Sequence, residues 1–475
     1  MPSDNATGHL TPGPTIQPPG SSAPPGFAYR SLAHLGLARP ELRAWALYDW
    51  ANSVFMTTVL QVFPLFFVSF AAKGLPEATA RSRFAFATST AVILVALIGP
   101  FLGAVADVKG RKKAFLGGFL ALGVTSTAAM YLIGEGHWVF ALFLFVVGNI
   151  GVTSTLAFYN ALLPGIAHPD EVDRVSTGGF ALGYLGGGLL LGMNLVVMQN
   201  PVRWGIADTA TATRLAFVSA AIWWAVFSVP LFLRVAEPRV EPLSTNEKGR
   251  GVVSIALTRL RATVGDLRDH RDAAILLLAF LVYNDAVNTI IRMATTFGDE
   301  LGIPTPKLVA AILLVQFVGF PAAFAFGFLA DRIGAKRSIF VGLAVYGGIT
   351  IFAFNLRTTT EFFIMAILVA TVMGGTQALS RSLFATMIPK HKAGELFGFF
   401  GVFDRFGGAL GALVFGIVLQ TTGSSRPAIL TLLVFFALGA ILLSRVDVER
   451  GRRKAREAEV HHAAERHSET QPSPA

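Results

Sequence analysis

The chain has 475 residues, of which 53% are hydrophobic and 14% charged, and its mean hydropathy is +0.59. This composition excludes an ordinary water-soluble protein of this length and predicts several membrane-spanning helices. The absence of cysteine excludes disulfides, zinc–thiolate sites, iron–sulfur clusters and cysteine nucleophiles. The net charge is +10, but the basic residues fall mainly in short loops and tails, so they indicate membrane orientation and not nucleic-acid binding.

Residues 1–42 are rich in Pro, Gly and Ser and predict a disordered tail. Twelve apolar stretches follow, each long enough to cross a bilayer as a helix. Their predicted limits are 45–71, 84–106, 112–133, 138–163, 176–198, 214–235, 272–295, 307–330, 336–356, 361–388, 395–420 and 427–445. We therefore predict an all-α membrane protein with twelve transmembrane helices.

The spans divide into two groups of six. Residues 43–236 would form an N-terminal bundle and residues 271–447 a C-terminal bundle, joined by a basic linker at 237–270. A charged tail at 448–475 follows, and we expect it to be disordered apart from a short helix near 449–459. An N-terminus in the cytoplasm would place most of the 39 Lys and Arg residues in cytoplasmic loops and tails, which predicts that both termini are cytoplasmic.

The first span carries an unexpected polar stripe. Asp49, Asn52 and Ser53 stand at i, i+3 and i+4, so they share one helix face, with Tyr48 beside them. A polar stripe in a membrane helix favours contact with protein or water over lipid. Asp49 could bind a substrate ammonium or a proton. Alternatively, it caps the start of the helix or pairs with a loop cation as a cytoplasmic gate.

Several short motifs recur in the second half of the chain. The loop Gly103 to Lys113, G-A-V-A-D-V-K-G-R-K-K, matches Gly327 to Arg337, G-F-L-A-D-R-I-G-A-K-R. The D-x-x-N-S-V sequence that starts at Asp49 recurs as D-x-x-N-T-I from Asp285. Such matches in one order predict two pseudo-symmetric six-helix halves with a substrate site between them at mid-membrane. The glycines of spans five and eleven predict close helix packing.

The paired G-x-x-x-D-x-x-G loops resemble the signature of the major facilitator superfamily. W-A-L-Y-D-W-A-N-S-V-F, V-S-T-G-G-F-A-L-G-Y-L-G-G-G, Y-N-D-A-V-N-T-I, Q-A-L-S-R-S and R-V-D-V-E-R-G are similar to the vacuole-effluxer branch of autophagy-related amino-acid effluxers and their bacterial members. The resemblance covers about residues 43–451. It implies the major facilitator fold and secondary transport, with amino acids as the favoured substrates and the bacterial inner membrane as the location.

Span seven carries a second polar face. Asp285 lies about 13 residues into the span, about 20 Å along the helix, where a charge is costly unless it is neutralised, paired or hydrated. Asn288, Thr289 and Arg292 follow at i+3, i+4 and i+7. This row suits a zwitterionic ligand or reversible protonation, but it equally suits an internal Asp285–Arg292 network. Between Asp285 and Asp49, we favour Asp285 as the coupling residue.

Two further cations are predicted within the membrane, Arg381 in span ten and Arg405 in span eleven, with Gln377 one turn before Arg381. Together these side chains could form an anion site, because arginine forks bind carboxylates and phosphates in two-pronged fashion. Alternatively, the arginines tie spans to carbonyls or acids at the cytoplasmic gate. Asn160 in span four either lines the cavity or joins helices, and joining helices is the commoner role.

A gating role is predicted for Asp107, Arg111, Asp331 and Lys336 in the paired loops. An acid at the end of span two or eight can meet a neighbouring helix N-terminus or arginine and hold one face closed. The other interpretation is a plain positive-inside anchor.

The sequence therefore predicts a secondary transporter that moves a small polar or zwitterionic solute by alternating access, with proton coupling as a hypothesis. We expect a monomer in a lipid bilayer, with no cofactor, no metal site, no catalytic residues and no nucleic-acid partner. All nine histidines fall outside the predicted spans, and no phosphate-binding G-x-x-x-x-G-K-[ST] loop is present. The alternatives are a transport-fold sensor, a lipid scramblase or, less favoured, a membrane-embedded enzyme.

Overall fold

The computed structural model describes residue 32 and residues 35–237, 250–258, 270–406, 409–422 and 425–470. Within these ranges, a few helical residues, including Arg292 and Arg405, are described by their backbone alone. Most of the predicted tail 1–42 and much of the predicted linker 237–270 fall outside the described residues. In the described part of the chain all regular structure is helical, and eleven helices are long and apolar enough to cross a membrane.

The first six spans follow one another with short connections. The opening span is continuous from Pro40 to Ala71 but contains two π-helical segments. It consists of α2 (Pro40–Val54), η1 (Phe55–Val59), α3 (Leu60–Phe66) and η2 (Phe67–Ala71). The other five spans of this half are α4 (Glu77–Lys109), α5 (Lys112–Ala129), α6 (Trp138–Ile166), α7 (Val172–Gln199) and α8 (Thr209–Arg234).

The second half repeats this order, and a charged helix follows it. Its first four spans are α10 (Arg271–Glu300), α11 (Thr305–Ile333), α12 (Ala335–Asn355) and α13 (Thr359–Thr386). The predicted eleventh span is divided between α14 (Ala393–Phe406) and α15 (Ala409–Thr422), and the twelfth between α16 (Ser425–Leu430) and α17 (Leu432–Ser444). The chain then continues into α18 (Val448–Thr470). The predicted all-helical, twelve-span fold class is thus confirmed.

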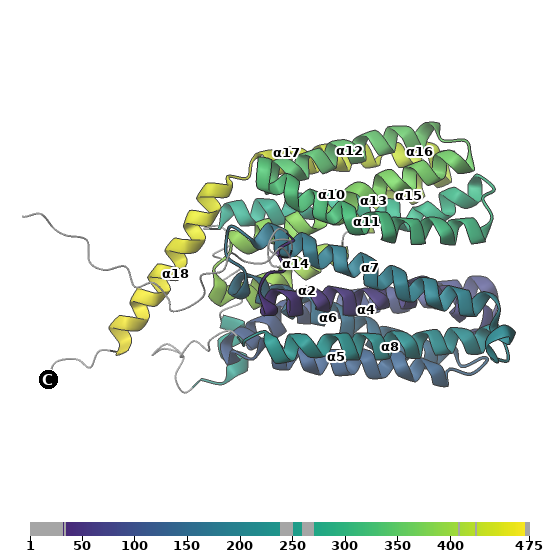
Figure 1. The fold of residues 1–475 in the computed structure, drawn as a ribbon, viewed down its shortest axis with the longest axis horizontal. Helices are drawn as coiled ribbons and strands as arrows, with labels where there is room; N and C mark the ends of the chain where they lie inside the picture. Colours follow the sequence, from purple (N-terminus) through teal and green to yellow (C-terminus); the bar gives the residue numbers. More distant parts are fainter. Residues whose placement is uncertain are drawn as a thin grey trace, which may run out of the picture.

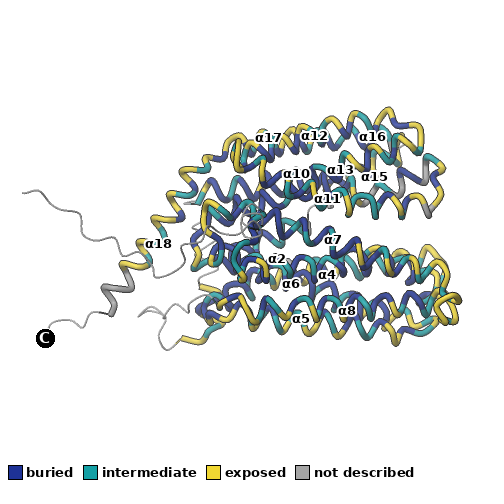
Figure 2. The backbone as a smooth tube through the Cα atoms, in the orientation of Figure 1, coloured by how far each residue is buried: buried dark blue, intermediate teal, exposed yellow. Residues whose placement is uncertain are grey.

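The two halves form two layers of roughly parallel helices (Figure 1). The helix α18 projects from one end of the bundle, which we call the α18 end. Large apolar side chains such as Leu97 and Leu233 remain more than 70% exposed on the outside, while the buried residues concentrate between the helices (Figure 2). This distribution is expected when the outer faces contact lipid and not water.

The backbone conformation explains why both repeated loops contain a glycine at the same position. Helix α4 ends at Gly110 with φ of 56°, and α11 ends at Gly334 with φ of 86°. Residues with a side chain rarely adopt these positive φ values, so glycine closes both helices three residues after the repeated aspartate. The sequence motif therefore encodes matching turns at the α18 end of each half.

Each repeated loop has a lysine that contacts the last span of its own half, although Lys113 matches Arg337 in the repeat and Lys336 matches Lys112. Lys113 Nζ donates to the carbonyls of Phe232 and Val235 at the end of α8. Lys336 Nζ donates in the same way to the carbonyls of Ser444 and Val446 at the end of α17. Each lysine thus satisfies carbonyl groups at the end of the last span of its own half.

The C-terminal segment departs from the expectation of a largely disordered tail, because α18 spans 23 residues. Oppositely charged residues three or four positions apart form ion pairs along this helix, as Arg452 and Glu449 do. It also docks on the second half. Arg450 donates two hydrogen bonds to Asp272 on α10, at 2.6 and 2.7 Å, and these bonds raise the pKa of the Arg450 guanidinium. Charge composition alone indicated solvation and could not reveal this docking.

Substitution of Arg450 by Gln should loosen α18 without unfolding the bundle. Because the Arg450 side chain is 45% exposed, solvent screens its attraction to Asp272, so we expect the α18 helix to detach only a few times more often. Hydrogen exchange of the α18 backbone amides measures this change. Arg453→Gln is the matched control, since Arg453 is 62% exposed and makes only a long ion pair, at 3.9 Å, with Glu457 of the same helix. Equal exchange in the two variants would contradict the assigned docking contact.

Candidate functional site

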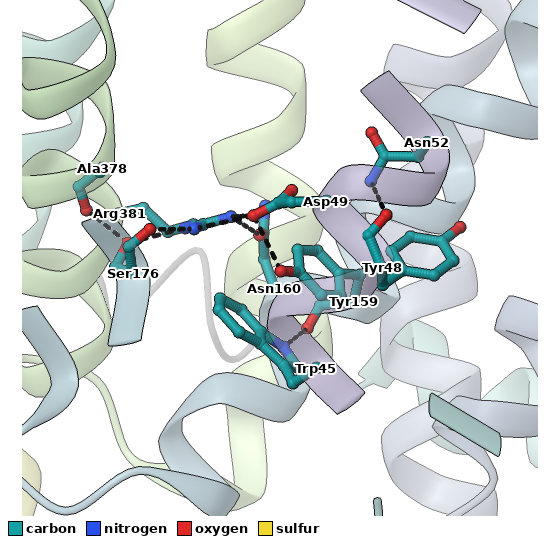
Figure 3. Close-up of polar contacts among 9 residues, drawn as sticks. All are labelled: Trp45, Tyr48, Asp49, Asn52, Tyr159, Asn160, Ser176, Ala378 and Arg381. Atoms are coloured by element: carbon teal, nitrogen blue, oxygen red, sulfur yellow. Dashed lines mark hydrogen bonds and ion pairs between the residues drawn. The ribbon is translucent and has the colours of Figure 1, made fainter. Parts of the chain in front are cut away.

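A buried ion pair joins the two halves (Figure 3). Its arginine, Arg381, lies five residues before Thr386, the last residue of α13, which Arg452 of α18 contacts. Both Nη atoms of Arg381 on α13 lie 3.2 Å from Oδ2 of Asp49 on α2. The residues Asp49 and Arg381 are only 7% and 4% exposed. The hydroxyl of Tyr159 on α6 donates to the same carboxylate oxygen at 2.9 Å. Three donors from two elements therefore converge on one oxygen atom.

The guanidinium of Arg381 is held on its other sides by the first half. Its Nε donates to Ser176 Oγ and its Nη2 to the Ser176 carbonyl, each at 2.9 Å, while Nη1 donates to Asn160 Oδ1 at 3.2 Å. The Ser176 hydroxyl in turn donates to the carbonyl of Ala378 on α13. Thus an arginine from the second half is bound almost entirely by side chains and carbonyls of the first.

Aromatic rings enclose this cation. The guanidinium carbon of Arg381 lies 4.8 Å from the centroid of the Trp45 ring and 4.5 Å from that of Phe180. Trp45 stacks on Tyr159 with ring centroids 4.3 Å apart, and its indole Nε1 donates to the Tyr159 carbonyl. Cation–π attraction is stronger where water is excluded, so the rings offset part of the cost of burying the charge.

The polar stripe of the first span, for which the sequence predicted contact with protein or water, faces the glycine-rich face of α7. A Cβ atom on Gly179 would lie 2.5 Å from Asp49 Oδ2, and one on Gly183 would lie 2.6 Å from Ser53 Oγ. Glycines therefore let α2 and α7 approach closely enough for Asp49 to reach Arg381. Asn52 donates to the Tyr48 carbonyl of its own helix, and the Tyr48 ring points away from the ion pair (Figure 3).

The repeated aspartates also contact the opposite half. Asp107, on α4, accepts hydrogen bonds from the backbone amides of Gly394 and Glu395, at 3.2 and 2.8 Å, at the start of α14. Asp331, on α11, pairs with Arg174 on α7 at 3.1 Å. The sequence predicted a helix N-terminus or an arginine as the partner of each acid, and one of each is present.

The basic members of these loops have other surroundings. Lys112, which the sequence analysis did not select, forms a buried ion pair with Asp107 at 2.8 Å. Lys336 contacts α17 of its own half, and Arg111 is exposed. Only the two aspartates among the four predicted gating residues therefore form a contact between halves in the described part of the structure.

The predicted face of span seven separates into different environments. Asp285 accepts hydrogen bonds from the amides of Leu410, at 3.2 Å, and Gly411, at the start of α15. The Thr289 hydroxyl donates to the Asp285 carbonyl of its own helix, and Asn288 is half-buried. The side chain of Arg292 lies outside the described residues, so the proposed Asp285–Arg292 network remains a prediction.

A second polar chain crosses the C-terminal half from α13 through α10 to α14. Gln377 Nε2 donates to Asn284 Oδ1 at 3.2 Å, and Asn284 Nδ2 donates to Asp404 Oδ1 at 3.0 Å. Gln377 and Asp404 are half-buried, whereas Asn284 is fully buried. Gln377 lies one turn from Arg381 on α13. The side chain of Arg405 lies outside the described residues, so the predicted anion site with Arg405 stays a prediction.

The sequence analysis selected Asp49 and Arg381 separately but did not pair them. It passed over Tyr159, Ser176, Asn284 and Asp404 as members of these networks. Asp404 carried a usable signal, because it is an acid inside a predicted span, as Asp285 is. Tyr159 and Ser176 carried none, since a tyrosine or serine in a membrane helix is common.

Comparison with known proteins places this chain in a family. Residues 38–456 match the family described as "Vacuole effluxer Atg22 like". An uncharacterized MFS-type transporter of Bacillus subtilis, YxiO, is 35% identical over 410 residues, which cover 86% of this chain and 94% of that protein. Autophagy-related protein 22 of Yarrowia lipolytica is 27% identical, over 59% of this chain and 51% of that protein. The chain thus spans about half the length of this fungal relative.

Solved structures support the same fold. The human organic anion transporter MFSD10 superposes with a TM-score of 0.67 at 15% identity, covering 85% of this chain and 99% of that one. FucP, a major facilitator superfamily transporter in its outward conformation, gives a TM-score of 0.64 at 14% identity, covering 86% and 100%. At such low identity the likeness concerns the arrangement of helices alone.

Replacement of Gly179 by Ala should destabilise the protein, because the new Cβ would lie 2.5 Å from an Asp49 oxygen that three donors hold in place. We expect a loss of about 1–3 kcal/mol, typical of overpacking. Gly192→Ala on the same helix is the control, since its Cβ would meet only Leu313 Cδ2 at 3.8 Å. Thermal unfolding in detergent measures both variants, and an unchanged Gly179→Ala protein would refute the close α2–α7 contact.

Proposed function

The chain belongs to the vacuole effluxer Atg22-like family and is a multi-pass membrane transporter of the major facilitator superfamily; on that premise, we propose that it moves a small polar or zwitterionic solute by alternating access. Amino acids are the favoured class, and both termini would face the cytoplasm at a bacterial inner membrane. Support for the orientation comes from the basic loops and tails. The buried Asp49–Arg381 pair is the observation that carries the mechanism.

In this proposal the ion pair is the gate at the α18 end. It links α2 of the first half to α13 of the second, so the halves cannot separate there without breaking it. Breaking a buried pair is costly because it leaves each charge without a partner. Removal of one partner typically destabilises a protein by about 3–5 kcal/mol. Opening therefore requires that Asp49 or Arg381 gain water or another ligand.

Three further contacts would act with this gate. The Asp107 carboxylate holds the first amides of α14, Arg174 pairs with Asp331, and the Ser382 hydroxyl donates to Asp173. Each one joins a residue of the first half to one of the second, at the α18 end. They support a closed state at this end, in which a solute would approach from the opposite side.

The polar chain of Gln377, Asn284 and Asp404 is our candidate for solute recognition. It is partly accessible and begins one turn from Arg381, on the side away from the α18 end. The Asp404 carboxylate suits an ammonium group, and the Gln377 amide can donate to a carboxylate. A zwitterion bound between them would lie beside the gate, where its charges could compete for Arg381.

Proton coupling through Asp285, and less favourably through Asp49, completes the proposal. The Asp285 carboxylate accepts hydrogen bonds from the first amides of α15 and is stabilised by their partial positive charge. Protonation would weaken this contact between α10 and α15. A change in the position of α15 during the transport cycle could thereby depend on the proton gradient.

The gate can be tested by separating its two charges. Asp49→Asn and Arg381→Gln should each shift the protein toward a state open at the α18 end, since each leaves one buried charge. The double variant should recover part of the closed-state population that each single variant loses, with a coupling energy between the two sites above about 1 kcal/mol. Distances between spin labels on α4 and α14 report the opening, and additive effects of the two substitutions would contradict the gate. Arg174→Gln, whose pair is about one-third exposed, should change the distances less.

Substrate and coupling can be tested by uptake of labelled amino acids into proteoliposomes, with and without a pH gradient. Asp404→Asn should raise KM about tenfold or more, as loss of one charged hydrogen bond does. Asp285→Asn should abolish the effect of the pH gradient while leaving solute exchange intact. Gradient-driven uptake unchanged by Asp285→Asn would refute the coupling assignment, and absence of any amino-acid flux would refute the substrate class.

A further inference from the structure

A cavity of about 400 Å³ opens on the side of the first half, at the α18 end. It lies between α2, α7 and α8, and all of its lining residues belong to the first half. Its volume falls within the range of about 300–1,000 Å³ typical of small-molecule sites. Its lining includes Arg43, Leu47, Leu182, Pro230 and Arg234.

The charged lining residues are two exposed arginines, Arg43 and Arg234, and no acid accompanies them. Neither guanidinium makes a hydrogen bond or ion pair with any residue that the structure describes. The nearby acids have other partners, since Glu41 and Glu171 pair with Arg39, and the Glu237 carboxylate accepts the backbone amide of Lys113. The cavity therefore presents two positive charges without a counter-charge from its own walls.

The lining changes character with depth. Arg43 lies in the first turns of α2 and Arg234 is the last residue of α8, so both stand at the end of the bundle. Leu47 and Pro230 follow one turn deeper on the same two helices, about 6 Å further in, with Leu182 on α7 beside them. Cations at the membrane surface above apolar side chains match the headgroup and the chain of an amphiphile.

We propose that this cavity binds an anionic phospholipid. The two guanidinium groups would donate to its phosphate, and the first part of an acyl chain would lie against Leu47, Leu182 and Pro230. Arginine forks match phosphate geometry, and no lining carboxylate would favour the amine of a zwitterionic headgroup. Such a lipid would hold α2 against α8 six residues before Asp49, so it would act close to the ion pair between the halves.

Native mass spectrometry of the purified full-length protein tests this site, with phosphatidylglycerol or phosphatidylcholine added in a neutral detergent. We expect one retained phosphatidylglycerol, bound about fivefold more weakly for each of Arg43→Gln and Arg234→Gln. Arg332→Gln is the matched control, because Arg332 is exposed in the last turn of α11, as Arg234 is in α8, and lies outside the cavity. It should leave lipid retention unchanged.

Three outcomes would overturn the proposal. Undiminished retention of phosphatidylglycerol by the Arg43→Gln/Arg234→Gln protein would show that the lipid binds at another site. Equal retention of phosphatidylcholine would reduce the cavity to an apolar groove without headgroup recognition. Displacement of the lipid by millimolar inorganic phosphate would indicate a small-anion site. Size-exclusion profiles and thermal unfolding in detergent establish that each variant is folded, so loss of lipid by a folded double variant supports the site.

Discussion

The ion pair between Asp49 and Arg381 is the constraint on which the surrounding structure depends. A buried charge in a membrane protein requires a partner and further hydrogen bonds, and here the partner comes from the opposite half. Tyr159, Asn160 and Ser176 complete the hydrogen bonding of the pair. The glycine at position 179 of α7 follows from the same requirement, because a Cβ there would lie 2.5 Å from the Asp49 carboxylate oxygen.

The two halves use related motifs for different contacts. Asp107 holds the start of α14 through backbone amides, whereas the equivalent Asp331 pairs with a side chain, that of Arg174. Asp49 joins the halves, whereas its repeat equivalent, Asp285, contacts the start of α15 within its own half. By contrast, each half has a lysine that donates to carbonyls at the end of its last span, Lys113 in the first half and Lys336 in the second, although the two are one position apart in the repeat. Equivalent positions of a pseudo-symmetric fold can thus have different partners in the two halves.

The position of the polar groups along the bundle gives the molecule a direction. The ion pair and the three contacts that accompany it lie at the α18 end, and the chain of Gln377, Asn284 and Asp404 begins one turn beyond the pair. The arginine-lined cavity at the same end is lined by residues of the first half alone. Contacts between the halves, solute recognition and lipid contact would therefore act at neighbouring but distinct places.

The sequence by itself determined the membrane class, the order of the spans, the two-fold repeat and the acids that contact the opposite half, because hydropathy and local motifs act over short stretches of chain. It also singled out Asp49 and Arg381, since charges inside an apolar span are conspicuous. It ranked Asp285 above Asp49 as the coupling residue from depth along the helix. Depth does not reveal which groups surround a carboxylate, and the two acids have different partners. Only the tertiary structure paired Asp49 with Arg381, 332 residues away, and brought Asn284 to Asp404 and α18 to Asp272. Such contacts depend on how distant helices pack, and no local pattern in the sequence specifies that packing.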